Sequence, residues 1–101
     1  MVLGWCRLLS NEIDQAIDLL IKSRASNPRP WVTHFALAAA MGLKGDRDEA
    51  KAALAESLGR NPEVDSLARF RAYRPWGSPQ YWALFEKTAA TGLRQAGLPD
   101  E

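Results

Sequence analysis

Residues 31–62 read WVTHFALAAAMGLKGDRDEAKAALAESLGRNP, and this stretch decides the fold class. It contains two helix-forming runs, over about residues 30–43 and 47–59, with Gly45 between them and Pro62 at the end. The same sequence pattern also occurs 34 residues earlier in the chain. The identities at this spacing are Ala16 and Ala50, Leu20 and Leu54, Ser23 and Ser57, Asn27 and Asn61, and Pro28 and Pro62. A fixed period of this length is typical of stacked helical hairpins, and it favours a binding surface over a catalytic pocket.

The repeated pattern resembles the tetratricopeptide repeat, a helix–turn–helix unit with a characteristic set of residues. The second copy reads His34-x2-Leu37-Ala38-x2-Met41, then Ala50-x3-Leu54 and Pro62. The first copy reads Leu3-Gly4-x2-Arg7, then Ala16-x3-Leu20 and Pro28, and its opening residue would fall before Met1. The resemblance covers about residues 1–64. It implies an all-α fold, a right-handed superhelix of antiparallel helical hairpins.

This resemblance divides the chain into three parts. They are a truncated first repeat at residues 1–29, a second repeat at 30–64, and a C-terminal helical pair at 65–101 that caps the array. Because the first repeat lacks its opening residues, we expect the chain to be part of a longer protein. His34 stands where the repeat usually has Trp, and we expect it to be packed or hydrogen-bonded in the hairpin interface.

Six helices and no strand are predicted, over about residues 1–9, 12–25, 30–43, 47–59, 65–73 and 79–96. The expected N-caps are Ser10 or Asn11, Asp46 with Glu49 three residues later, and Ser78 before Pro79. Gly97 is expected to end the last helix in the left-handed conformation, with Leu98 folded back onto Leu93.

The C-terminal third carries a second resemblance. The segments Arg71-Ala72-Tyr73-Arg74-Pro75 and Gly92-Leu93-Arg94-Gln95-Ala96-Gly97-Leu98-Pro99 are similar to the tails of tetratricopeptide arrays in bacterial class III adenylate and guanylate cyclases. In that family a nucleotide cyclase domain precedes the repeats. The present chain has no strand-borne pair of metal-binding aspartates. The resemblance therefore implies an origin in a signalling protein, and no cyclase activity for these residues.

Composition limits the function classes. At 101 residues and 47% hydrophobic, the chain suits one globular domain. Its formal net charge of +1 offers no general attraction to nucleic acid or to an anionic membrane. Cys6 is the only cysteine, which excludes an internal disulfide and favours a reducing, cytoplasmic location. No apolar run is long enough to span a bilayer.

The sequence contains no set of residues with the types and spacing typical of a catalytic, cofactor-binding or metal-binding site. His34 is the only histidine, so a histidine pair for zinc is excluded. Residues 45–49 superficially resemble a calcium loop but lack its twelve-residue spacing and final Glu. We therefore expect that this chain alone is not an enzyme and takes no cofactor.

The basic residues near the C-terminal third have two interpretations. Arg69, Arg71 and Arg74 lie close in sequence to Tyr73 and Trp76, a combination that could contact phosphates and stack on bases. In the alternative, the arginines face solvent and the aromatic rings pack under the last helix. The near-zero net charge favours this alternative, so no nucleic-acid partner is expected.

The tetratricopeptide resemblance implies a concave face lined by the first helix of each hairpin. The matching positions are Trp5, Leu8, Leu9, Val32, Phe35, Ala39, Gly42 and Leu43. This predicted groove is apolar, so the expected partner is a protein or peptide with an amphipathic helix or an apolar segment. The alternative is that the helix at 79–96, or a helix upstream of Met1, already fills the groove.

The truncated N-terminal edge suggests self-association. Val2, Trp5, Cys6 and Leu9 would be exposed there, and exposed apolar patches tend to be buried by association. A homodimer is therefore predicted. Two function classes remain: a non-catalytic protein-interaction module of a larger bacterial signalling protein, and a regulatory or dimerisation segment of a class III cyclase with no separate partner.

Overall fold

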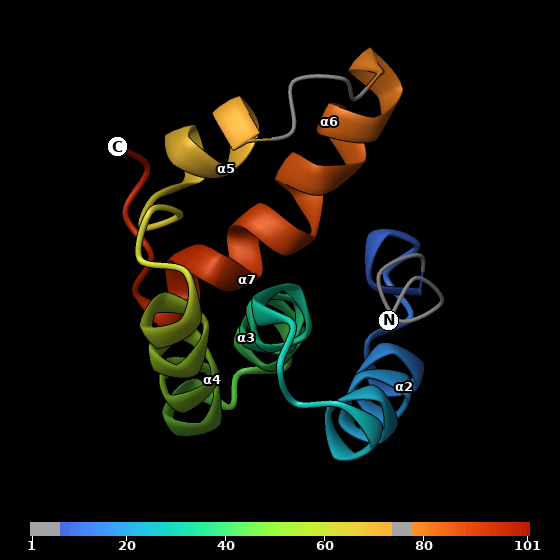
Figure 1. The fold of residues 1–101 in the computed structure, drawn as a ribbon. Coiled ribbons are helices and arrows are strands. Elements are labelled where there is room, and N and C mark those ends of the chain that lie inside the picture. Colours follow the sequence, from blue (N-terminus) through green and yellow to red (C-terminus); the bar gives the residue numbers. More distant parts are fainter. Residues whose placement is uncertain (1–6, 74–77) are drawn as a thin grey trace.

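A computed structural model describes residues 7–73 and 78–101 of the chain (Figure 1). Its elements are α2 (Ile13–Ser26), α3 (Trp31–Lys44), α4 (Arg47–Arg60), α5 (Leu67–Tyr73), α6 (Pro79–Lys87) and α7 (Ala89–Ala96). Residues 7–9 are also helical, and the remainder of the helix predicted at 1–9 lies outside the described residues. Every regular element of the described part is an α-helix, which confirms the all-α prediction.

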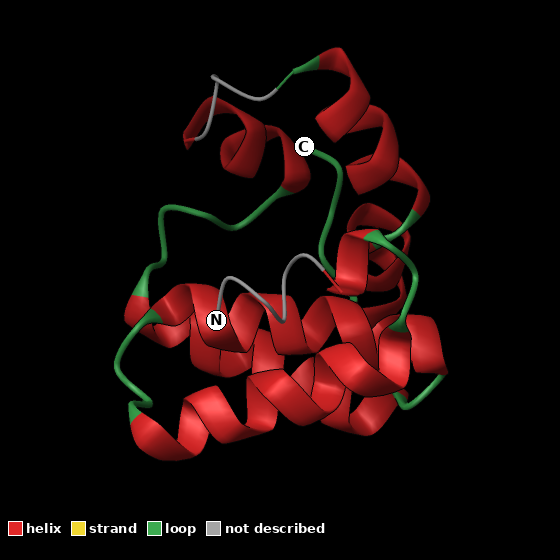
Figure 2. Ribbon diagram, turned by 90° about the vertical axis from the view of Figure 1, so that its right-hand side faces the viewer, coloured by secondary structure: helices red, strands yellow, loops and turns green. Residues whose placement is uncertain are grey.

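Helix α3 lies at the centre of the molecule because almost its whole circumference is apolar or small. Its ten consecutive residues from Thr33 to Gly42 are buried. A helix that is apolar on all sides must be covered on all sides, and α3 packs against α2, α4 and α7. Figure 1 shows α3 between α2 and α4, with α7 crossing over it. In Figure 2, α5 and α6 stand above the layer formed by the longer helices.

The 34-residue period of the sequence is also present in the backbone. The first turn has hydrogen bonds from Asn11 N to Leu8 O (3.0 Å) and from Glu12 N to Arg7 O (2.8 Å). The equivalent bonds of the second turn join Gly45 N to Gly42 O (3.2 Å) and Asp46 N to Met41 O (2.9 Å). Helices α2 and α4 end alike, with Asn27 N donating to Ser23 O and Asn61 N to Ser57 O, both at 2.9 Å. The two copies therefore share one local turn geometry, while their assembly into a right-handed superhelix stays a prediction.

These turns bear on the predicted N-caps of α2 and α4. Asn11 and Gly45 both have a positive φ, 63° and 91° respectively, so each takes the left-handed position after a helix. The next residues, Glu12 and Asp46, are the N-caps of α2 and α4, with ψ of 72° and 76°, and they make no side-chain cap hydrogen bond. The prediction of Ser10 or Asn11 as the N-cap of α2 was wrong, since Glu12 holds that position. Asp46 is the N-cap of α4, as predicted, but its side chain makes no cap hydrogen bond. The same backbone turn that ends one helix sets the conformation of the residue that starts the next.

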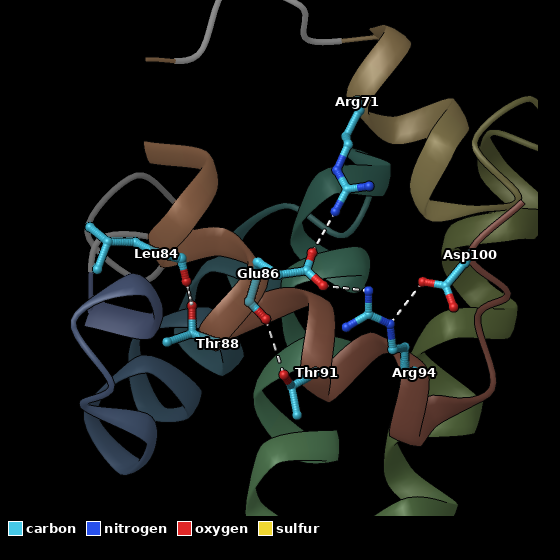
Figure 3. A network of polar contacts seen from close by, with 7 residues as sticks. All are labelled: Arg71, Leu84, Glu86, Thr88, Thr91, Arg94 and Asp100. Atoms are coloured by element: carbon cyan, nitrogen blue, oxygen red, sulfur yellow. Dashed lines mark hydrogen bonds and ion pairs between the residues drawn. The ribbon is translucent and has the colours of Figure 1, made fainter. Parts of the chain in front are cut away.

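The single helix predicted at 79–96 is divided in two at Thr88, which has φ −116° and ψ −85°. The Thr88 hydroxyl donates to the Leu84 carbonyl at 2.7 Å, and the Thr91 hydroxyl donates to the Glu86 carbonyl at 3.1 Å (Figure 3). Threonine hydroxyls that bond to carbonyls of the preceding turn compete with backbone donors and bend helices. Sequence reasoning followed the apolar face and overlooked these two hydroxyls.

The predicted N-cap at Ser78 and the predicted helix end at Gly97 are confirmed. The Ser78 Oγ accepts a hydrogen bond from Tyr81 N at 3.1 Å, and Pro79 is the first residue of α6. Gly97 has a φ of 105°, and Leu98 N donates to Leu93 O at 2.9 Å, so Leu98 folds back and is buried. Each of these two features depends on residues within one turn of the point where the helix begins or ends.

Candidate partner-binding surface

The structure places the predicted groove residues in different environments. Leu8, Phe35, Ala39 and Gly42 are buried; Leu9, Val32 and Leu43 are partly exposed; Trp5 lies outside the described residues. We call Val32, Phe35, Ala39 and Leu43 the α3 stripe, because their spacing puts them on one face of α3. The two halves of this stripe are covered by different parts of the same chain.

Helix α7 covers the C-terminal half of the α3 stripe through contact between backbones. A Cβ atom built on Gly92 would lie 1.8 Å from Ala39 O and 3.0 Å from Leu43 Cγ. In the other direction, a Cβ on Gly42 would lie 1.9 Å from Gly92 O. Only glycine at both positions allows this approach, since real Cβ atoms essentially never come closer than 3.0 Å to such neighbours. Ala39 is therefore not accessible to a partner in this structure.

Helix α5 covers the N-terminal half of the stripe with an aromatic ring. The Phe70 ring stacks on that of Phe35, with centroids 4.7 Å apart and planes at 23°. Its second neighbour is Phe85 of α6, at 5.2 Å and 12°. Sequence reasoning named 79–96 as the helix that could fill the groove, and α7 belongs to that segment. It did not name α5, although Leu67, Phe70 and Tyr73 recur along its apolar face.

All aromatic residues that the structure describes belong to one network of ring contacts. Its successive members are Tyr73, Trp31, Phe35, Phe70, Phe85, Trp82 and Tyr81. The network begins at the surface, where Tyr73 is 53% exposed and contacts the half-buried Trp31 edge to face at 5.4 Å. Tyr73 therefore packs on α3, and the prediction that it lies under the last helix was wrong. A ring held from beneath by a packed core is a rigid surface anchor.

Charged side chains join α5 to α6 and α7. Glu86 accepts a hydrogen bond from Arg71 at 2.5 Å and another from Arg94 at 2.6 Å, while Arg94 Nε also donates to Asp100 at 2.8 Å (Figure 3). The hydrogen bond with Glu86, followed by that with Asp100, raises the pKa of the Arg94 guanidinium. Arg71 is thus engaged within the chain. Arg69 is exposed, as predicted, and Arg74 and Trp76 lie outside the described residues.

The end of the chain holds the start of α5. Leu67 N donates to Pro99 O at 3.0 Å, and Ala68 N donates to Asp100 O at 2.9 Å. We call residues 98–101 the C-terminal strap. These carbonyls satisfy amides in the first turn of α5 that have no partner within the helix. The strap and the Glu86 contacts together hold α5 over the α3 stripe.

His34 has the structural role that was predicted for it. The side chain is 3% exposed, and Nε2–H donates to the Pro28 carbonyl at 2.8 Å. This bond ties the first turn of α3 to the loop that precedes it. Among the described residues, no group of His, Cys, Asp and Glu is arranged to hold a metal ion. None of the described helices combines the length and apolar character needed to cross a lipid bilayer.

Comparison of the chain with protein-family models, with curated proteins and with solved structures finds no match. The tetratricopeptide and cyclase-tail resemblances therefore stay predictions from the sequence. The structure itself defines a class: an all-α domain built around a central helix, with its own C-terminal third folded over that helix.

Proposed function

We propose that this chain is a non-catalytic helical interaction module that binds an amphipathic or apolar segment of another protein. Its binding surface is formed by the exposed ring of Tyr73 and the half-buried ring of Trp31. The observation that carries the proposal is the aromatic network that runs from the core to the surface at this place. Tyr and Trp dominate binding energy in protein interfaces, because they bury large areas while losing little side-chain freedom.

The geometry suits recognition by side-chain packing. Trp31 contacts Phe35 edge to face at 5.6 Å, and Phe35 is in turn fixed by Phe70. Tyr73 presents an exposed ring whose position is set by Trp31 beneath it. A partner that covered Tyr73 would thus gain apolar contact without ordering a loose side chain. Val32, the next residue of α3, is also partly exposed.

A display library of helical peptides, selected against the whole chain, tests the proposal. We expect enriched peptides that lose most of their affinity for the Tyr73→Ser chain. This substitution removes an exposed ring and should leave the fold intact, which circular dichroism would verify. The matched control is Tyr81→Ser at the far end of the aromatic network, which should retain binding. Enriched peptides that bind wild type and Tyr73→Ser equally would contradict the proposed surface, and a library without any binder would contradict the function.

A second candidate function is a regulatory or dimerisation segment of a class III nucleotide cyclase. One observation supports it: Arg71 and Arg94 come from the two segments that resemble cyclase tails, and both pair with Glu86. The tail residues therefore act together as one unit of the fold. Light scattering across a concentration series separates the two candidates, since a dimerisation segment associates with itself in the absence of any peptide. Of the predicted dimer edge, Val2, Trp5 and Cys6 lie outside the described residues, and Leu9 is partly buried and packs against the core.

A further inference from the structure

We propose that the protein segment bound at the rings of Tyr73 and Trp31 is acidic, with Asp or Glu side chains beside the apolar residue that covers the rings. This inference rests on the proposed function and deepens it by giving the charge of the partner. Two arginines carry it, Arg29 and Arg69, which lie next to the rings and have no carboxylate partner in the described part of the chain.

Each of the two rings has an arginine close to it on the same segment of the chain. Arg69 lies four residues before Tyr73 in α5, so these two exposed side chains are neighbours on one side of the helix. Arg29 lies two residues before Trp31, in the exposed loop at residues 27–30. The two rings meet at 5.4 Å, and their contact brings the two segments together at one part of the surface.

The guanidinium groups of Arg29 and Arg69 differ from those that are engaged within the chain. In the part that the structure describes, the hydrogen bonds of both residues are made by their backbones. Arg29 N donates to Asn27 Oδ1 at 3.2 Å, and Arg69 N donates to Ser66 Oγ at 3.1 Å. A guanidinium can hold a carboxylate through two parallel hydrogen bonds. The arginines that pair with carboxylates of the chain are Arg7, Arg60, Arg71 and Arg94.

The described carboxylates near α5 do not take up these two groups. Glu86 is engaged by Arg71 and Arg94 together. The exposed Asp65 lies four residues before Arg69, ahead of the first residue of α5, and forms no ion pair with it. A partner with carboxylates beside its apolar residue would therefore be complementary to this surface in charge as well as in shape.

Single-stranded nucleic acid is the competing partner, since arginines and aromatic rings also bind phosphates and bases. Two observations favour a protein segment. Two arginines can neutralise few phosphates, whereas nucleic-acid binding gains its affinity from many such contacts. The rings of Tyr73 and Trp31 also stand at 78° to each other, so they do not offer parallel faces to successive bases.

A display library of helical peptides tests the charge of the partner. Positions on both sides of an aromatic residue are varied evenly among Glu, Gln and Lys, and peptides are selected against the whole chain at low ionic strength. We expect enrichment of Glu with wild type, and of Lys with the double variant Arg29→Glu, Arg69→Glu. Both arginines are exposed, and Glu is favoured in the first turn of a helix, so the variant should fold, which circular dichroism would verify.

The affinity of one enriched acidic peptide measures the contribution of each arginine. We expect binding to weaken about fivefold for Arg69→Glu and by a similar factor for Arg29→Glu, because exposed ion pairs are weak and the reversal adds repulsion. Both losses should nearly vanish in about 1 M salt, where the screening length is about 3 Å. Fluorescence anisotropy with a labelled peptide measures all three proteins.

Lys51→Glu is the matched control, because it changes the net charge of the chain by the same amount. Lys51 is exposed in α4 near the turn at Gly45, at the opposite end of α3 from Trp31. It should weaken binding less than twofold. A loss as large as that of Arg69→Glu would assign the effect to net charge and overturn the proposed contacts.

The remaining outcomes separate this inference from the proposed function. Peptides that depend on Tyr73 but are enriched in Gln or Lys would overturn the acidic partner and leave the proposed function standing. A library without any binder would remove the proposed function itself. A labelled oligothymidylate that binds wild type, and binds neither Tyr73→Ser nor Arg69→Glu, would replace the protein partner by nucleic acid. Self-association of wild type that Arg69→Glu abolishes would make a second copy the occupant and overturn the proposal of a separate partner.

Discussion

Helices α7 and α5 cover two halves of the same stripe on α3, and they do so by opposite means. Helix α7 brings its backbone against that of α3 at Gly92 and Gly42, where a single added Cβ would lie within 2 Å of a carbonyl oxygen. Helix α5 reaches α3 through aromatic rings, with Phe70 on Phe35 and Tyr73 on Trp31. The first contact depends on the absence of side chains, and the second consists of side chains.

The difference decides which contact another molecule could replace. A backbone approach of this kind admits only a helix with glycine at the crossing point, and its energy comes from close packing over a long contact. A stacked ring and an exposed ion pair can be reproduced by any helix that presents the same groups. We therefore expect α7 to be held more firmly on α3 than α5 is. The following predictions test this distinction, in order of decreasing effect.

Gly92→Ala should have the largest effect. The new methyl group meets the Ala39 carbonyl, which belongs to the backbone of a buried helix and has little freedom to move. We expect a loss of about 3 kcal/mol in the free energy of unfolding, at the upper end of the usual range for overpacking. Urea denaturation measures it.

Gly59→Ala is the matched control for this substitution. Gly59 lies in α4 and has nothing within 4 Å of a built Cβ. Ala should stabilise the chain there by about 0.5 kcal/mol, because it restricts the unfolded state. Equal effects at Gly92 and Gly59 would show that the α3–α7 approach is looser than described.

Phe70→Ala should destabilise the chain by about 2 kcal/mol, less than the 3–5 kcal/mol typical of a buried Phe. The reason is that we expect α5 to detach locally, which would limit the loss to the free energy of its docking. Phe70→Leu keeps most of the apolar volume and should cost about 1 kcal/mol. Urea denaturation measures the stability loss of both variants, and amide exchange shows whether α5 stays protected in each. A cost above 4 kcal/mol with α5 still protected would mean that α5 is as much part of the core as α7.

Gly97→Ala should cost about 1 kcal/mol, because Gly97 has a φ of 105° that residues with a side chain adopt with strain. The strap begins at this turn, so the amides of Leu67 and Ala68 should also exchange faster. Gly45→Ala, at a φ of 91°, should cost a similar amount without changing exchange in α5. If both variants leave Leu67 and Ala68 equally protected, the strap does not hold α5.

Arg71→Met should have the smallest effect, about 0.5 kcal/mol, because both partners of the Arg71–Glu86 pair are 44% exposed and solvent screens the interaction. The difference should vanish in about 1 M salt, where the screening length falls to about 3 Å. Unfolding curves at low and high salt measure it. An effect that persists at high salt would indicate packing by the Arg71 stem instead of charge.

The raised pKa of Arg94 gives a prediction with a defined sign. A group whose pKa is higher in the folded state stabilises the fold fully below its unfolded pKa and loses that contribution only as the pH rises through the folded value. Arginine titrates far above neutrality, so the difference in stability between wild type and Arg94→Met should be constant from about pH 6 to pH 9. Thermal unfolding in that range tests it. A drift of the difference with pH would assign the dependence to another group.

Much of the fold could be predicted from short stretches of the chain. The bounds of α2, α3 and α4 lie within a residue or two of the predicted ones. The left-handed Gly97 and the Ser78 cap were also identified correctly. All these features depend on interactions within a turn or two of helix. The side-chain caps predicted for α2 and α4 are absent because the residues concerned also belong to the turn before each helix.

The candidate site was predicted less well, and the reason is long-range packing. An apolar stripe shows that α3 must be covered, but burial of apolar surface is non-directional and does not select the covering helix. Nothing in the local sequence assigns Gly92 to the crossing with Gly42, or the Phe70 ring to the face of Phe35. Local sequence patterns thus determined where the helices of the repeated part lie, how their turns form and that they recur every 34 residues. Only the tertiary structure decided that α7 closes one half of the α3 stripe through backbone contact and that α5 closes the other through side chains.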